Sequence, residues 1–183
     1  MFKTIVSTIS AALLATMPTA TLAAGNDFQA HGNLWAAVNE TGVRTYINPS
    51  QCGGTESNIH GFYSSMGGVL VVCQDNRQQV GVEVEWTAND LDTLRHEAQH
   101  LVQDCIDGRS DQSLLNFFST REELKDYVTS ILTTEQIGGI IKAYSDRGAD
   151  EKTILLELEA FAVAQNESAN TIATAVRDIC NVR

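Results

Sequence analysis

Two histidines and a glutamate near the middle of the chain constrain the fold more than any other feature. His96, Glu97 and His100 form an HExxH pattern. The segment opens with capping-box-like residues at positions 87–90, which predicts a helix running to about Ile106. Histidines four residues apart stand on the same helical face. A metal site on that face therefore needs a second element packed against it.

The HExxH pattern predicts a zinc site on this helix. Both imidazoles can reach one tetrahedral Zn²⁺. Glu97 lies next to the first ligand and can act as general base toward a metal-bound water. A hydrolytic zinc site takes three protein ligands and an open fourth position. No histidine follows His100, so we expect the third ligand to be a carboxylate on a later helix.

The segment 151–164 is the best place to find that carboxylate. Glu157 begins a stripe of small and apolar residues at i+3, i+4 and i+7, which would let this helix approach the HExxH helix closely. A carboxylate on such a stripe needs a metal or another cation. Glu159 lies about 200° around the helix and is the alternative ligand. Two solvated glutamates on an exposed helix are the third interpretation.

HExxH on one helix and Glu-x-x-Ala on a later one resemble the gluzincin branch of the zincin metallopeptidases. The resemblance implies a zinc peptidase acting on peptides or proteins. In it His96, His100 and Glu157 bind the metal and Glu97 is the catalytic base. Asp104 is similar to an aspartate of thermolysin-like helices that supports a ligating histidine from behind.

The resemblance covers the two motif helices and the strand before them, and it assigns no specific family. Phe161 stands where the Glu-x-x-Ala-Asp signature of one integral-membrane group has an aspartate. Residues 61–63 and 67–73 look similar to the loop and edge strand along which zincins place their substrate. An exposed strand edge can pair with any extended peptide. A plain core strand is the equal alternative.

The N-terminal 24 residues have the layout of a cleaved secretory signal peptide. Lys3 is the only charge, an apolar run extends from Ile5 to about Leu14, and small residues at Ala23 and Ala24 provide a cleavage site. A membrane anchor is the alternative, but the run is short for a bilayer span. We therefore expect an exported protein whose residues 25–183 form one zincin-like domain, with no later membrane span.

Charge and cysteine content add two expectations. The net charge of -11, with no basic run, argues against nucleic acid as a partner. The even number of cysteines suits disulfides in an exported protein. We expect the pairs Cys52–Cys73 and Cys105–Cys180, the first around one β unit and the second between two helices. Four reduced thiols are the alternative.

The order of the patterns predicts an α+β fold, with strands first and helices after a change of composition near Trp86. We expect a small, antiparallel N-terminal sheet and a long loop over 54–68. The predicted strands are 34–38, 43–47, 69–72 and 80–86. After the HExxH helix, capping residues predict helices at 121–132, 134–146, 151–165 and 169–181.

Two further questions stay open at this level. The oxyanion of an amide hydrolase needs a donor besides the metal, and the sequence offers His60, Tyr63, Tyr127 and Tyr144. The rivals to a peptidase are a non-catalytic zinc-binding protein of the cell envelope and a disulfide-stapled binding protein with an accidental HExxH.

Overall fold

The computed structural model describes residues 28–53, 57–109 and 113–180. The expected signal peptide, residues 1–24, lies outside this part of the chain. The α+β prediction is confirmed, with a small sheet in the N-terminal half and a helical C-terminal half. The elements in chain order are α2 (Phe28–Glu40), β1 (Arg44–Ile47), the 3-10 turn η1 (Ser50–Cys52), β2 (Gly61–Ser64), β3 (Val69–Val72), α3 (Ala88–Cys105), α4 (Arg121–Ile131), α5 (Thr134–Ser145), α6 (Glu151–Asn166) and α7 (Ala169–Ile179).

The five helices from α3 onward begin at the predicted capping residues. In each, the capping side chain accepts a hydrogen bond from the backbone N–H three residues further on. This contact satisfies one of the free N–H groups that every helix start leaves. The caps are Thr87, Thr120, Thr133, Asp150 and Ser168. Local hydrogen bonding therefore fixes where each helix starts.

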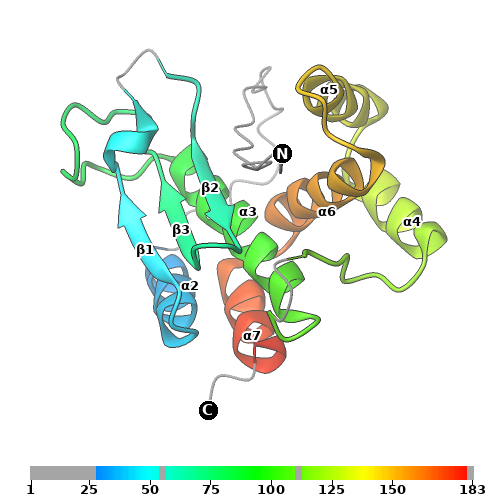
Figure 1. Cartoon of the computed structure of the whole chain (residues 1–183), viewed down its shortest axis with the longest axis horizontal. Coiled ribbons are helices and arrows are strands. Elements are labelled where there is room, and N and C mark those ends of the chain that lie inside the picture. The colour runs from blue at the N-terminus through cyan, green and yellow to red at the C-terminus, as the bar shows by residue number, and fades with distance from the viewer. Residues whose placement is uncertain (1–27, 54–56, 110–112, 181–183) are drawn as a thin grey trace, which may run out of the picture.

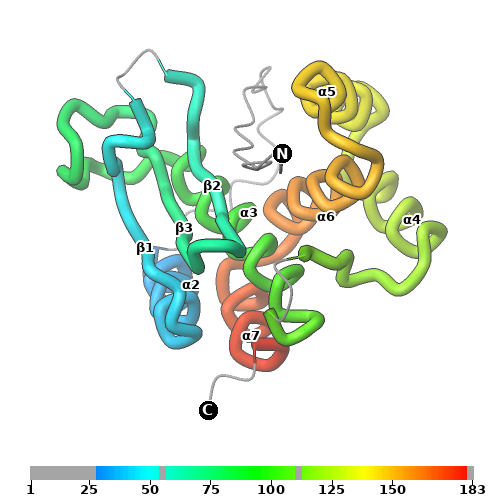
Figure 2. The backbone as a smooth tube through the Cα atoms, in the orientation of Figure 1, coloured from blue at the N-terminus to red at the C-terminus, as the bar shows by residue number. Residues whose placement is uncertain are grey.

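Helix α3 lies at the centre of the molecule, with the sheet on one side and α4, α5 and α6 on the other (Figure 1). Helices α2 and α7 pack against each other (Figure 2). One apolar cluster joins the sheet, α2, α3 and α7. A second joins α4, α5 and α6. The HExxH helix is consequently held from several sides.

The sheet is mixed, so the expectation of an antiparallel sheet is wrong for one of its two strand pairs. The strand order is β1-β3-β2, with β1 parallel and β2 antiparallel to β3. A tight turn joins β2 to β3 and forces the antiparallel pairing, while β1 comes to the opposite edge of β3. The residues 67–73, compared above with a zincin edge strand, thus contain the central strand. The edge strand next to α3 is β2.

Two predicted strands are wrong, and one strand was missed. Residues 34–38 belong to α2, which buries Ala30, Leu34, Ala37 and Val38 at helical spacing. Residues 80–86 form no strand, because side chains replace a neighbouring strand as their partners. Gln74, for example, accepts from the N–H of Val84 and donates to its carbonyl. The expected loop over 54–68 contains β2.

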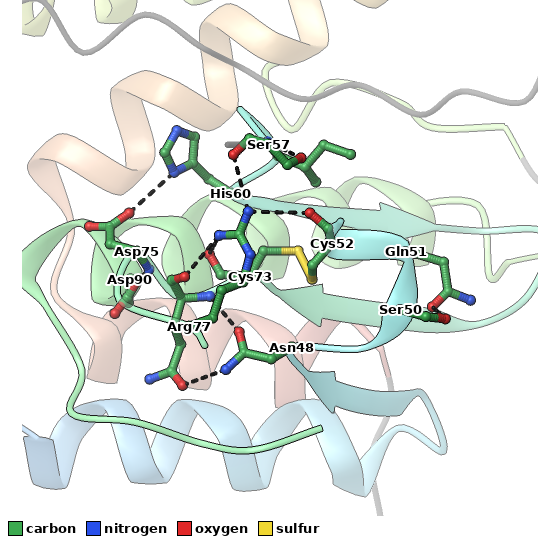
Figure 3. The surroundings of a disulfide bond; sticks show 12 residues. Asn48, Ser50, Gln51, Cys52, Ser57, His60, Cys73, Asp75, Arg77 and Asp90 are labelled. Carbon is green, nitrogen blue, oxygen red and sulfur yellow. Dashed lines mark hydrogen bonds and ion pairs between the residues drawn. A yellow bond between two sulfur atoms is a disulfide. The ribbon is translucent and has the colours of Figure 1, made fainter. Parts of the chain in front are cut away.

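Both expected disulfides are present, Cys52–Cys73 and Cys105–Cys180. Figure 3 shows the first, which links η1 to the end of β3 beside the buried guanidinium of Arg77. Arg77 donates to the carbonyls of Cys52 at 3.2 Å and Ser57 at 3.1 Å. The second joins the end of α3 to the end of α7. The turn η1 and the end of α3 are each anchored covalently.

Candidate metal centre

The contact between α3 and α6 carries the candidate site. His96 and His100 of α3 and Glu157 of α6 are all buried, and their donor atoms lie within 4.8 Å of one another. The structure thus brings together the three predicted ligands. Glu159 is also fully buried, so the interpretation of both glutamates as solvated is wrong.

The spacing of the donor atoms fits a small divalent cation. His96 Nε2 lies 3.1 Å from His100 Nε2 and 3.2 Å from Glu157 Oε2, and His100 Nε2 lies 3.4 Å from Glu157 Oε1. Two ligand atoms bound to one tetrahedral zinc are roughly 3.3 Å apart. Glu157 Oε2 has no hydrogen-bond partner in the described part of the chain. This buried group could therefore hold a metal ion, and its nitrogen and oxygen donors suit zinc.

The protonation states of the two histidines and Glu157 depend on one another's charges. Burial alone would lower the pKa of His100, but the Glu157 carboxylate outweighs burial and raises the pKa to about 9. Burial would raise the pKa of Glu157, yet the two imidazoles hold it below its usual range. An imidazolium thus balances the carboxylate in metal-free protein. A metal ion that binds here has to displace its proton.

Glu97 lies on the side of α3 that faces the edge strand. Burial raises the pKa of its carboxyl group, and the nearby imidazoles oppose that rise. The backbone N–H of Tyr63 faces this carboxylate as a donor. Gly61 allows the close approach, because a Cβ there would lie 2.6 Å from Thr93 Cγ2 and 3.2 Å from Glu97 Cγ. Strand β2 therefore runs directly against the predicted catalytic base.

Within the described residues β2 pairs with a strand on one edge only, and its other edge is turned toward the site. The N–H of Cys73 donates to the carbonyl of His60 at 2.7 Å. In an antiparallel pair the backbone groups of successive residues alternate between the partner and the open side. Positions 60, 62 and 64 consequently face β3, and Gly61 and Tyr63 present their backbone groups on the open edge. The Tyr63 N–H faces Glu97 and so points away from β3, as this alternation requires.

Gln103, not Asp104, contacts one of the predicted ligand histidines. His100 Nδ1 lies 2.7 Å from Gln103 Oε1. Asp104 instead accepts from the Tyr63 hydroxyl at 2.5 Å, and Arg109 Nε lies 3.4 Å from the same carboxylate oxygen. The expected role of Asp104 is therefore wrong, because β2 places Tyr63 within its reach. Asp104 fastens the edge strand to α3.

Glu159 is the residue whose role the sequence pattern least revealed. It contacts neither histidine in the described structure but accepts from Gln99 Nε2 and Gln103 Nε2, each at 2.9 Å. It also accepts from Asn116 Nδ2 and the backbone N–H of Phe117. The one local signal was the spacing of Gln103 three residues after His100, which puts both on one helical face.

Aromatic side chains close the other side of the site. The ring centroids of Phe161 and His96 are 4.5 Å apart. His96 Nδ1 has no hydrogen-bond partner among the described residues. Tyr144 of α5 is also buried, and its hydroxyl likewise has none. Burial first, and then the nearby charge of Glu157, raises the pKa of Tyr144. Its hydroxyl therefore lies close to the ligand carboxylate.

The four oxyanion donors suggested by the sequence differ in their contacts. The Tyr63 hydroxyl is bound to Asp104, and the Tyr127 hydroxyl lies 3.4 Å from a Glu167 oxygen. His60 Nδ1 lies 3.1 Å from Asn89 Nδ2. Among these four, the hydroxyl of Tyr144 lacks such a partner in the described chain and faces the ligand group.

Comparison with known proteins returned no family model, no curated protein and no solved structure that matches this chain. None of the described helices combines the length and apolar character that a membrane span requires.

Proposed function

We propose that this protein is an exported zinc hydrolase that cleaves amide bonds in peptides or proteins. The observation that supports this most directly is the buried convergence of His96, His100 and Glu157, with Glu97 beside them on α3. Three protein ligands leave a fourth coordination position for water, as in catalytic zinc sites.

The chemistry divides between the metal and Glu97. Zinc, when bound, lowers the pKa of water toward about 7 and polarises a carbonyl group. Glu97 accepts a proton from the attacking water and returns it to the leaving amine. Burial raises the pKa of its carboxyl group, which brings the base closer to the working pH of such a reaction.

The open edge of β2 favours an extended peptide as substrate. Apart from the Tyr63 N–H, which faces Glu97, the backbone groups that Gly61 and Tyr63 turn away from β3 can pair with a peptide main chain whatever its side chains. A peptide paired in this way would pass alongside Glu97, since β2 touches that residue. We propose that the Tyr144 hydroxyl donates a hydrogen bond to the developing oxyanion from the side of the site opposite β2.

Export agrees with both disulfides. Disulfides persist in oxidising compartments outside the cytoplasm. We therefore place the mature protein in the periplasm or the external medium.

Metal content is the first test. Elemental analysis of the purified wild type should give one zinc per chain. His100→Ala and Glu157→Ala should lose it, and Glu151→Ala, at the exposed start of the same helix α6, should keep it. A folded wild type that takes up no zinc would refute the proposal.

Glu97→Gln separates catalysis from metal binding. This variant should keep its zinc and lose about 10²- to 10⁴-fold of its hydrolysis of quenched-fluorescence peptides, the usual contribution of a general base. Glu151→Gln again serves as the matched control. Equal activity of Glu97→Gln and wild type would exclude Glu97 as the base.

A non-catalytic zinc protein is the alternative, and the low exposure of the ligands favours it. The side chains of His96 and His100 keep only 10% and 9% of their surface exposed. In that case the zinc would resist removal by chelators, and no peptide would be cleaved. Chelator sensitivity together with hydrolysis decides between the two.

A further inference from the structure

The side-chain amide of Gln103 can be oriented in only one way. Its nitrogen lies 3.0 Å from the carbonyl oxygen of Leu156 and 2.9 Å from Glu159 Oε1. A carbonyl and a carboxylate only accept hydrogen bonds, so the NH₂ group must be on that side. The amide oxygen therefore faces His100 Nδ1, at 2.7 Å. Because this oxygen only accepts, Nδ1 must carry a hydrogen.

The hydrogen on Nδ1 decides which nitrogen of His100 is available to a metal. A neutral imidazole carries one N–H and one lone pair, so a hydrogen on Nδ1 leaves the lone pair on Nε2. His100 Nε2 is the atom that lies 3.1 Å from His96 Nε2 and 3.4 Å from Glu157 Oε1. The hydrogen bond to Gln103 thus selects the ring form that the site needs.

Glu159 holds Gln103 in this orientation. Its carboxylate is fully buried and is bound by neutral donors from two parts of the chain. Gln99 and Gln103 donate from α3, while Asn116 and Phe117 donate from the segment before α4. A buried carboxylate is costly unless it is well hydrogen-bonded. These donors therefore fix its position, and with it the position of the Gln103 amide.

We propose that Glu159 and Gln103 are positioning residues that fix the tautomer and orientation of His100 for metal binding. The inference rests on the proposed metal site, and it assigns a role to the α6 glutamate that does not bind the metal. Supporting groups behind a ligating histidine typically account for about 10- to 100-fold of metal affinity.

Gln99 provides a matched control. It lies one helical turn before Gln103, is also buried, and donates to the same Glu159 oxygen at the same 2.9 Å. Of the two, Gln103 makes the hydrogen bond to His100. Gln103→Met and Gln99→Met therefore remove equivalent contacts to Glu159, and only the first removes the contact to the ligand.

Zinc affinity is measured by competition with a chromophoric chelator. Gln103→Met should weaken zinc binding about 10- to 100-fold, and Gln99→Met less than about threefold. Glu159→Gln should weaken it as well, but it should add little in the Gln103→Met background, because Glu159 acts through Gln103. Equal effects of the two methionine variants, or additive effects of Glu159→Gln and Gln103→Met, would overturn the proposal.

A metal-free measurement separates this proposal from the proposed function. In histidine-labelled, chelator-treated wild type, ¹⁵N NMR should show an Nδ1–H of His100 that exchanges slowly with solvent. Gln103→Met should lose this protection and Gln99→Met should keep it. A wild type without that signal would refute the positioning role even if zinc binds. A wild type that binds no zinc but shows the signal would refute only the metal site.

Discussion

The Cys105–Cys180 disulfide should contribute more to stability than Cys52–Cys73, because it closes a longer loop. Cys105 and Cys180 are 75 residues apart in the sequence, and Cys52 and Cys73 are 21 residues apart. A cross-link restricts the unfolded chain by an amount that grows with the logarithm of loop length. At 25 °C this gives about 4.5 kcal/mol for the long loop and about 3.3 kcal/mol for the short one.

The assay is urea unfolding of three metal-free proteins, namely the oxidised wild type and the two double alanine variants. Replacing Cys105 and Cys180 should lower the free energy of unfolding by roughly 1 kcal/mol more than replacing Cys52 and Cys73. Cys52 and Cys73 are both fully buried, so replacing them also removes packing. This loss adds to the cost of removing the shorter loop and therefore works against the expected difference. The slope with urea is fitted separately for each protein, since a freed chain exposes more surface on unfolding.

A larger loss for the short loop would contradict the prediction and show that packing around η1 outweighs the difference in loop length. Zinc content gives a second readout. The proposed ligands lie on α3 and α6, so a folded variant without Cys105 and Cys180 should still bind one zinc. Loss of zinc from that folded variant would show that the clamp to α7 also sets the position of α3.

Three other changes test separate parts of the site. Tyr144→Phe should lower kcat about 10²- to 10³-fold and leave zinc affinity unchanged, as expected for an oxyanion donor; a loss of zinc affinity would instead show that the hydroxyl supports the ligand carboxylate. The pKa of His100 is raised from 6.5 to about 9, so its stabilising contribution to metal-free protein is complete below pH 6.5 and is lost as the pH rises through about 9. Urea unfolding across that range checks this, and zinc-loaded protein should show the opposite trend because protons compete with the metal. Gly61→Ala would place a Cβ 2.6 Å from Thr93 Cγ2 and should cost about 1–3 kcal/mol of stability, whereas Gly67→Ala, with its nearest contact at 3.4 Å, should cost less.

The five helices from α3 onward could be predicted well because their signals are local. Thr87, Thr120 and Thr133 each form a capping box with a residue three positions later, so both partners stand in one short stretch of sequence. Asp150 and Ser168 cap by the same kind of contact. Such contacts need no knowledge of the rest of the fold.

The strands were harder because their pairing depends on distant residues. Residues 34–38 are an apolar run that fits a strand or a buried helix, and burial of Ala30 and Ala37 as well identifies the helix only once the core is known. Residues 80–86 alternate like a strand, but Asn48 and Gln74 take their backbone hydrogen bonds. The parallel pairing of β1 follows from the position of β3, which the sequence of β1 does not encode.

The three candidate ligands could be predicted because spacing alone places them. His96 and His100 share a face by their four-residue separation, and Glu157 stands out on an apolar stripe. The partner of His100 could not be predicted in this way. Gln103 and Asp104 are adjacent in sequence, and which of them reaches the histidine depends on Tyr63, from a strand that the sequence pattern did not reveal.

The buried polar groups around Glu157 and those around Glu159 differ in how completely they are hydrogen-bonded. This difference favours ligand binding at Glu157. Around Glu159 every carboxylate oxygen has donors, as a purely structural network requires. Around Glu157, His96 Nδ1 is buried with no hydrogen-bond partner among the described residues, and one carboxylate oxygen and the Tyr144 hydroxyl are buried with no well-formed hydrogen bond there, although His96 Nε2 lies 3.2 Å from that oxygen and the hydroxyl lies close to the same carboxylate. Unsatisfied buried groups are costly, and a network selected only for stability would not collect them in one place. A bound cation would replace the imidazolium that balances Glu157 in metal-free protein, and a substrate oxyanion would give the Tyr144 hydroxyl an acceptor, so the incomplete hydrogen bonding around Glu157 is what a site built for both should show.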